Sequence, residues 1–326
     1  MSGHQLTGAV ADSRPEVLVM TPRIPFLLGR LEQAYRVHRF WEAADPASFL
    51  SNVGQGVRVV VTNGVVGCPS DVMRALPDLG LVAVGGVGLD AVDLTQARER
   101  GIQVTTTPDV LTDDVADQAL ALLLAVSRQL LRGDRYVREG GWERAEELPL
   151  TSRVSGKRAG IVGLGRIGKA IAKRLVAMNM RVAYTGRHQQ NDQPYRFIPD
   201  VLELAHHADV LIVSSAGGNG TRHLVGAQVL QALGPSGILI NVARGSVVDE
   251  SALVGALQGG RLGGAGLDVF ADEPHVPVAL RALDNVVLAP HAGTRTVEAR
   301  REMAELVLAN IEAFLAGKVL VSPISP

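Results

Sequence analysis

The stretch RAGIVGLGRIGKAIAKRL, residues 158–175, decides the fold of this chain. A short apolar strand pattern runs into the glycine turn Gly163–Gly168 (GLGRIG), and apolar residues then recur at helical spacing. In such a unit the first glycine permits a tight turn, the second lets the backbone approach a pyrophosphate, and the third allows close helix–strand packing. The unit therefore predicts a pyrophosphate at a helix N-terminus. A glycine turn that binds nothing is the alternative, because the chain contains 36 glycines.

Short apolar runs alternate with helical patterns on both sides of this stretch. The strands expected before it are Val17–Met20, Val37–Phe40, Val57–Thr62, Leu81–Val84 and Gln103–Thr105. Those expected from it onward are Ala159–Val162, Arg181–Thr185, Val210–Ser214, Ile238–Val242, Gly266–Phe270 and Val286–Leu288. This alternation predicts an α/β protein with parallel, doubly wound sheets. A length of 326 residues suits two domains at roughly 150 residues each.

Three further segments stand outside the strand series. Asp113–Leu131 is expected to form one helix, apolar nearly all round and hence at a domain or subunit interface. Gly133–Thr151 reads as a loop-rich excursion. Thr296–Leu315 carries apolar residues on one side at helical spacing, which predicts a final amphipathic helix.

Composition excludes several classes of protein. With 32 basic and 33 acidic residues the formal net charge is −1, which argues against a nucleic-acid-binding role. The single cysteine, Cys68, rules out an intramolecular disulfide, suits a reducing cytoplasm and is expected to be a packed small residue. The most apolar stretch, Ala119–Val126, is too short to span a membrane, and the N-terminus lacks the pattern of a secretory signal. No metal-ligand spacing or G-x-S-x-G elbow occurs, so neither a metal site nor a hydrolase is predicted.

The strand that follows the glycine turn ends without an acidic residue. An NAD site usually has Asp or Glu there to bind the ribose 2′-OH, whereas this chain reads Tyr184-Thr185-Gly186-Arg187-His188. A carboxylate would repel a 2′-phosphate, and Arg187 can pair with one. We therefore predict NADP(H), with NAD(H) possible; a solvated surface cation is the alternative for Arg187. Arg166, inside the glycine turn, is a candidate second phosphate contact.

A cation, a carboxylate and an imidazole follow strands of the second series. Ligands of open parallel sheets bind outside the carboxyl ends of the strands, so Arg244, Glu273 and His291 are expected to meet there. Arg244 could hold a carboxylate and polarise a carbonyl, and His291 could donate a proton to the oxygen. Glu273 could orient the imidazole and favour its charged form. Hydride reduction of a 2-oxo acid requires these three functions. Taken alone, His291 could also be a core histidine.

Six stretches resemble the D-isomer-specific 2-hydroxyacid dehydrogenases. They are VGLDAVDL, TPDVLTDDVADQALALLLAVSR, GIVGLGRIG, NVARGSVVDESAL, GLDVFADEP and NVVLAPHAGTRTVEARREMAELV. They extend from about residue 80 to the C-terminus. Within the family the chain is most similar to NADPH-dependent glyoxylate/hydroxypyruvate reductases and hydroxyphenylpyruvate reductases. The resemblance implies a flavodoxin-like substrate domain of residues 1–104 and 294–326, and a Rossmann dinucleotide-binding domain of residues 105–293.

The resemblance also assigns roles to residues. It implies the roles argued above for Arg244, Glu273 and His291. It also implies that Arg244 and the backbone of Val87 and Gly88 bind the substrate carboxylate. Asp268 is implied to contact the nicotinamide carboxamide. The full set of predicted cofactor-binding residues is Gly163, Leu164, Gly165, Arg166, Ile167, Gly168, Gly186, Arg187, Val242, Ala243, Asp268, His291 and Gly293. Family members usually form homodimers through the region that matches Asp113–Trp142, and in some reductases a tryptophan near Trp142 reaches the partner's active site. We therefore expect a cytoplasmic homodimer with no nucleic-acid or membrane partner.

The expected activity is NADPH-dependent reduction of small 2-oxo acids, such as glyoxylate and hydroxypyruvate, to D-2-hydroxy acids. One alternative is an aryl-pyruvate reductase, and another is a non-catalytic dinucleotide sensor, because dehydrogenase-like co-repressors share the Arg, Glu and His set. Two segments depart from the family pattern. Ser215–Gly220 replaces the usual Pro-Leu-Thr, and Arg295 stands beside the predicted site. Arg295 is either a surface residue or a group that binds a second anion, as 3-phosphoglycerate dehydrogenase would need.

Overall fold

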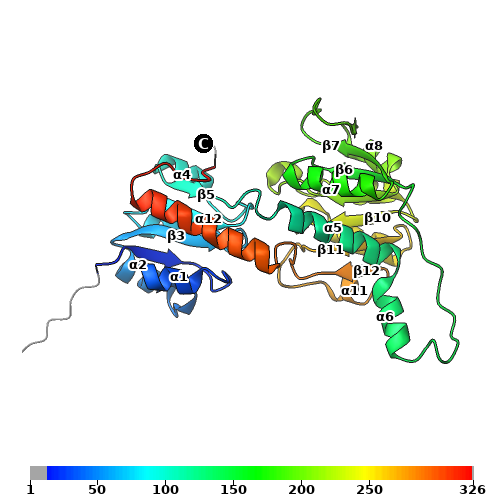
Figure 1. The fold of residues 1–326 in the computed structure, drawn as a ribbon, viewed down its shortest axis with the longest axis horizontal. Helices are drawn as coiled ribbons and strands as arrows, with labels where there is room; N and C mark the ends of the chain where they lie inside the picture. Colours follow the sequence, from blue (N-terminus) through cyan, green and yellow to red (C-terminus); the bar gives the residue numbers. More distant parts are fainter. Residues whose placement is uncertain (1–12, 325–326) are drawn as a thin grey trace, which may run out of the picture. The chain divides into compact units, whose positions relative to one another are not determined.

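The computed structural model describes residues 13–324, which divide into two compact units (Figure 1). The first unit combines the chain up to Pro108 with the chain from Arg300 onward, and the second unit is Asp109–Ala299. Each unit contains one parallel β-sheet among the described residues. The two-sheet α/β fold predicted from the strand–helix alternation is thereby confirmed.

The sheet of the first unit has five strands within the described chain, in the order β2-β1-β3-β4-β5. This is the flavodoxin-like order. The strands are β1 (Glu16–Val19), β2 (Arg36–Arg39), β3 (Val57–Asn63), β4 (Leu81–Gly85) and β5 (Gln103–Thr105). The helices are α1 (Leu28–Ala34), η1 (Phe40–Glu42), α2 (Pro46–Val53), α3 (Ser70–Ala75), α4 (Leu94–Glu99) and the greater part of α12 (Val297–Leu315).

Side-chain alternation along these strands builds two hydrophobic layers. Val17 and Val19 of β1 point to the face covered by α1 and α12, where they pack with Leu31 and Ile311. Leu18 points to the opposite face, which is covered by α2, α3 and α4. A strand buried on both faces reads as a continuous apolar run, which is why β1, β3 and β4 were recognisable in the sequence.

The sheet of the second unit has seven strands within the described residues, in the order β12-β11-β10-β9-β6-β7-β8. The order reverses direction beside β6, as in a Rossmann fold. The strands are β6 (Arg158–Val162), β7 (Arg181–Thr185), β8 (Arg196–Phe197), β9 (Val210–Val213), β10 (Ile238–Asn241), β11 (Gly264–Leu267) and β12 (Val286–Leu288). The helices are α5 (Thr112–Ser127), α6 (Leu130–Arg138), α7 (Arg166–Ala177), α8 (Val201–His207), η2 (Asn219–Thr221), α9 (Ala227–Leu233), η3 (Gly245–Val247), α10 (Glu250–Gln258) and α11 (Val278–Arg281).

Helices cover both faces of the seven-stranded sheet. On one face α8, α9 and α10 share a hydrophobic cluster with the strands. On the other face α7 contacts β6 and β7, and α5 contacts β10 and β11. Gly264 and Gly266 let α5 approach β11 closely, since a Cβ at either position would lie 2.8–2.9 Å from Val126 or Leu122.

Two strand predictions for this sheet were wrong. The strand predicted at Gly266–Phe270 is β11 and ends at Leu267, so Asp268 lies just beyond its carboxyl end. The glycines that admit α5 weaken the strand signal, while Val269 and Phe270 are buried without belonging to the strand. The two-residue strand β8 was not predicted, because Arg196 and Phe197 are too few to form a recognisable apolar pattern.

The helix predicted at Asp113–Leu131 is also corrected. Helix α5 ends at Ser127, and α6 begins at Leu130 after Gln129 adopts a left-handed conformation with φ 46°. Helix α6 occupies the first part of the segment predicted as loop-rich, Gly133–Thr151. Three polar residues, 127–129, lie at the break, but a polar run this short also occurs inside helices, so the sequence pattern alone does not reveal it.

The final helix α12 begins at Val297, one residue after the predicted start. Thr296 precedes it, and its hydroxyl accepts a hydrogen bond from the N–H of Ala299 at 3.1 Å. Of the helices in residues 13–324, none has the length and apolar character that crossing a membrane requires.

Candidate active site

The three glycines of the turn Gly163–Gly168 have separate structural roles. Gly163 has φ 93°, and a Cβ there would lie 2.6 Å from the Cα of Ser215. A Cβ at Gly168 would lie 2.2 Å from the carbonyl oxygen of Gly163, so Gly168 permits the close packing of α7 on the turn. A Cβ at Gly165 would meet no atom within 4 Å. Gly165 therefore borders open space that a bound group could fill.

Backbone donors face this open space. The N–H groups of Leu164 and Gly165 donate no hydrogen bond to another described residue, and Gly165 caps the N-terminus of α7. The first amides of a helix have no partner inside the helix and carry its positive dipole end. Open space and unused donors at one helix end fit a dinucleotide pyrophosphate.

Two arginines lie near the turn. Arg166 is the first residue of α7, and its Nε lies 2.7 Å from Oδ1 of Asp109, with both side chains largely exposed. Gly186 and Arg187 directly follow the carboxyl end of β7 and are exposed. The Arg187 side chain makes no hydrogen bond or ion pair within the described chain, so its charge is available to a ligand.

His291 and Glu273 are brought together although 18 residues separate them. Nδ1 of His291 lies 2.7 Å from Oε2 of Glu273, and Oε1 of Glu273 accepts a hydrogen bond from the N–H of Phe270 at 3.2 Å. Partial burial of Glu273 favours its neutral acid form and would raise its pKa. This effect is outweighed by the hydrogen bond and charge of His291, by the Phe270 N–H and by the charge of Arg244. The pKa of Glu273 is therefore lowered. Glu273 occupies Nδ1, while Nε2 of His291 makes no hydrogen bond with a described residue and so is available to a substrate.

Arg244 follows β10 and starts the turn η3. Its Nη1 donates to the carbonyl of Ala243 at 2.6 Å, and the amide of Asn241 donates to the Arg244 carbonyl at 3.0 Å. A Cβ at Gly245 would lie 1.9 Å from the carbonyl carbon of Phe270, so this glycine allows the Arg244 segment to lie against the segment leading to Glu273. The structure thus places the predicted cation, carboxylate and imidazole in one unit, at the carboxyl ends of β10, β11 and β12.

Asp268 has a structural role that the sequence did not reveal. Its side chain is buried, and its carboxylate accepts hydrogen bonds from the N–H groups of Ala292 at 2.7 Å and Gly293 at 2.9 Å. Gln118 of α5 donates to the same carboxylate at 3.4 Å. The N–H of His291 donates to the Asp268 carbonyl at 2.9 Å. Asp268 therefore holds the turn that carries His291, whose φ is 50°.

Other predicted site residues lie outside the group formed by His291, Glu273 and Asp268. Val242 and Ala243 are each only 7% exposed. Their N–H groups already donate to Val213 and to the side chain of Asn241. In the first unit, Val87 and Gly88 follow β4, and neither N–H donates a hydrogen bond to a described residue. The side chain of Val87 is 42% exposed. Arg295 is exposed, and no contact with a described residue fixes its guanidinium.

Cys68 is completely buried, as predicted for a packed small residue. Burial, together with the nearby charge of Asp71, raises the pKa of its thiol to about 12. A thiol with that pKa is protonated at neutral pH and is a poor nucleophile.

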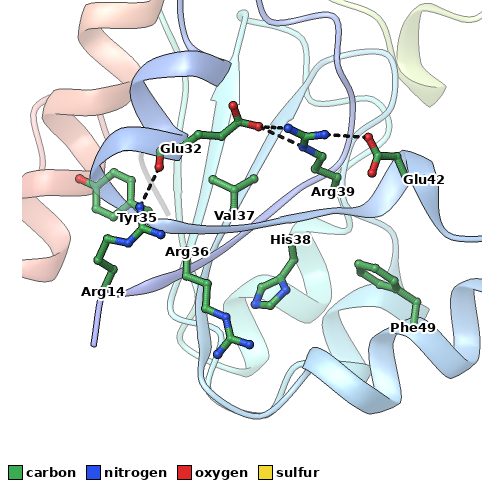
Figure 2. Close-up of a pocket in the computed structure, with 9 residues that line it drawn as sticks. All are labelled: Arg14, Glu32, Tyr35, Arg36, Val37, His38, Arg39, Glu42 and Phe49. Carbon is green, nitrogen blue, oxygen red and sulfur yellow. Dashed lines mark hydrogen bonds and ion pairs between the residues drawn. The ribbon is translucent and has the colours of Figure 1, made fainter. Parts of the chain in front are cut away.

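A separate polar hollow lies along the edge strand β2 in the first unit, and Figure 2 shows the residues that line it. Two of the arginines that line it are paired with carboxylates. Arg39 binds Glu32 at 3.0 Å and Glu42 at 3.1 Å, and Arg36 binds Glu16 at 2.8 Å. Since carboxylates hold Arg36 and Arg39, these two side chains offer an anion little free positive charge. No site residue predicted from the sequence lines it.

Comparisons with known proteins agree with this geometry. Residues 120–293 match the family model of the D-isomer specific 2-hydroxyacid dehydrogenase, NAD binding domain. The chain is 47% identical over 308 residues to the glyoxylate/hydroxypyruvate reductase A of Arabidopsis thaliana, covering 94% of this chain and 98% of that protein. It is 46% identical over 308 residues, with the same coverage, to the hydroxyphenylpyruvate reductase of Plectranthus scutellarioides.

A solved structure gives the same result for the fold. The NADPH-dependent glyoxylate/hydroxypyruvate reductase of Sinorhizobium meliloti, in complex with NADP and malonate, superposes with a TM-score of 0.89 at 42% identity. The match covers 96% of this chain and 97% of that structure. The family model matches more than half of the chain, and the two plant reductases match nearly all of it at 46–47% identity. This chain therefore belongs to the D-isomer specific 2-hydroxyacid dehydrogenase family of oxidoreductases.

Proposed function

We propose that this protein reduces small 2-oxo acids to D-2-hydroxy acids with NADPH as the hydride donor. The observation that carries the proposal is the contact between His291 and Glu273 at 2.7 Å, in the same unit as Arg244 and the glycine turn. Relatives named as glyoxylate/hydroxypyruvate and hydroxyphenylpyruvate reductases support the substrate class.

The proposed chemistry follows from the side chains of Arg244, Glu273 and His291. A bound nicotinamide cofactor would supply the hydride. Arg244 polarises the carbonyl and neutralises charge on the substrate. His291, protonated and held by Glu273, donates the proton that converts the developing alkoxide to an alcohol. The unused N–H groups of Val87 and Gly88 are proposed to bind the substrate carboxylate.

The cofactor site is proposed to consist of the glycine turn, for the pyrophosphate, and Arg187, for a 2′-phosphate. The available guanidinium of Arg187 and the absence of an acid between Gly186 and Gln190 favour NADPH over NADH. The name of the Sinorhizobium meliloti reductase, with NADP bound in its structure, supports the same preference.

Initial-rate assays with NADPH and with NADH test the proposal. Glyoxylate, hydroxypyruvate, pyruvate and phenylpyruvate form the panel, and consumption of the reduced cofactor is followed by absorbance. Fast NADPH-dependent turnover of glyoxylate or hydroxypyruvate is the expected result, whereas a preference for phenylpyruvate would identify an aryl-pyruvate reductase. Cofactor binding without turnover on the whole panel would contradict the proposed activity and favour a dinucleotide sensor.

A homodimer is proposed on the basis of an exposed apolar surface. Leu130 and Leu131 at the start of α6 are 60% and 51% exposed, Trp142 is 72% exposed and Leu150 is 98% exposed. These exposed apolar side chains all belong to residues 130–150. Large exposed apolar surfaces mark protein interfaces, and a second copy of the same surface is the partner proposed. Light scattering after size exclusion tests this: a dimer is expected for the native chain, and a Leu130→Glu/Leu131→Glu variant should be monomeric. A monomeric native chain would contradict it.

A further inference from the structure

The segment between β7 and β8, residues 186–195, is tied to the glycine turn by one side chain. Gln190 lies three residues after Arg187 and is partly buried. Its backbone N–H donates to the hydroxyl of Tyr184 at 2.7 Å, and its side-chain amide donates to the carbonyl of Leu164 at 2.7 Å. Gln190 therefore connects the Arg187 segment both to β7 and to the glycine turn.

The anchor on β7 is rigid. Tyr184 is fully buried, and its ring lies against Phe197 of β8 with a centroid separation of 5.3 Å. A second tie lies further along the segment, where Lys169 of α7 is 3.5 Å from Asp192. A buried ring has little freedom to move, so the hydroxyl that holds Gln190 is a fixed reference point.

Arg187 and its neighbour His188 are exposed, and their side chains make no hydrogen bond or ion pair with a described residue. Their positions are consequently set by the backbone of the segment. The covalent structure of NADPH limits the distance between its pyrophosphate and its 2′-phosphate to a narrow range. A protein that binds both groups gains affinity when its two binding elements are held at the matching separation before the ligand arrives.

We propose that Gln190 is a positioning residue that holds Arg187 at a fixed separation from the glycine turn and thereby sets the preference for NADPH over NADH. This inference rests on the proposed function, in particular on the 2′-phosphate contact of Arg187. Gln190 acts through the carbonyl of Leu164 and needs no contact with the nucleotide.

A double-mutant cycle tests the proposal by calorimetric titration with NADPH and NADH. Gln190→Met keeps the length of the side chain but cannot donate to Leu164. One hydrogen bond corresponds to roughly a two- to twelvefold change, so we expect the Kd for NADPH to rise about fivefold. The Kd for NADH should change less than about twofold, since only NADPH uses Arg187. In an Arg187→Ala background, Gln190→Met should leave the ratio of the two Kd values unchanged.

Two further variants complete the test. Gln189→Met is the matched control, since Gln189 is exposed and makes no hydrogen bond with a described residue; neither Kd should change. Tyr184→Phe removes the acceptor for the Gln190 N–H and should shift the NADPH Kd in the same direction as Gln190→Met. The inference would be overturned if Gln190→Met changed the Kd of both cofactors equally or changed neither. It would also be overturned if Gln190→Met still changed the ratio of the two Kd values in the Arg187→Ala background. Wild-type protein that binds neither cofactor would instead overturn the proposed function.

Discussion

The carboxylate of Asp268 accepts the backbone N–H groups of the two residues that follow His291, while the carbonyl of Asp268 accepts the N–H of His291 itself. The proposed proton donor therefore sits on a turn that a single buried acid holds in place. His291 has φ 50°, a conformation that costs energy for a residue with a side chain and persists only when its surroundings enforce it.

Asp268→Asn tests this support. The amide nitrogen cannot accept a hydrogen bond, so the N–H of Ala292 or Gly293 would be left unsatisfied at a cost of about 1–3 kcal/mol. We expect a lower free energy of unfolding in urea and a lower kcat. Asp272→Asn is the control, because that side chain is 86% exposed. Weaker cofactor binding with unchanged stability would instead favour the contact with the nicotinamide carboxamide predicted from the family.

His291→Ala should lower kcat by about 10²–10⁴-fold, the usual contribution of a positioned acid or base. The Kd of NADPH should change little, because the glycine turn and Arg187 remain. Steady-state kinetics and calorimetry measure the two quantities. His275→Ala is the matched control, since His275 is a 79% exposed histidine in the same unit. Full activity of His291→Ala would eliminate the proposed proton donor.

Glu273 should make stability depend on pH in a defined direction. The pKa of Glu273 in the folded protein lies below the ordinary 4.5, so the fold favours the carboxylate. Its stabilisation is therefore complete well above pH 4.5 and is lost as the pH falls through the folded-state pKa. Glu273→Gln should reduce the free energy of unfolding by about 1 kcal/mol near pH 7 and by progressively less below pH 4.5. Urea titrations across this range measure the difference, and a gap that widens toward acid would refute the assignment.

Two glycines of the turn should respond differently to alanine. Gly165→Ala adds a methyl group in open space, so the thermal midpoint should stay the same or rise slightly while NADPH affinity falls by about tenfold or more. Gly168→Ala places a Cβ against the carbonyl of Gly163 and should cost about 1–3 kcal/mol of stability. Calorimetric scans with and without NADPH separate the two effects. Unchanged cofactor affinity in Gly165→Ala would show that the open space is not the pyrophosphate site.

The sequence by itself determined the α/β class, most of the strands and the glycine turn, since each is a local pattern. Apolar runs such as Val57–Thr62 identify buried strands, and a glycine at the position of Gly163 identifies a backbone conformation. The positions of Arg244, Glu273 and His291 after strands of the second series also came from the chain alone, and the resemblance of six stretches to one family implied the same roles for them.

Only the tertiary structure decided how these residues meet. The contact between Glu273 and His291, the support of the His291 turn by Asp268 and the tie between Gln190 and Leu164 all join segments distant in sequence. The sequence predicted that Glu273 would orient His291, but it could not give the geometry of that contact. The other two contacts have no local signature, because each partner is chosen by strand order and loop path. The break at Gln129 and the early end of β11 went unpredicted for a related reason. The apolar residues around them are set by packing against other elements, and hydrophobicity along the chain does not show where a helix or strand stops.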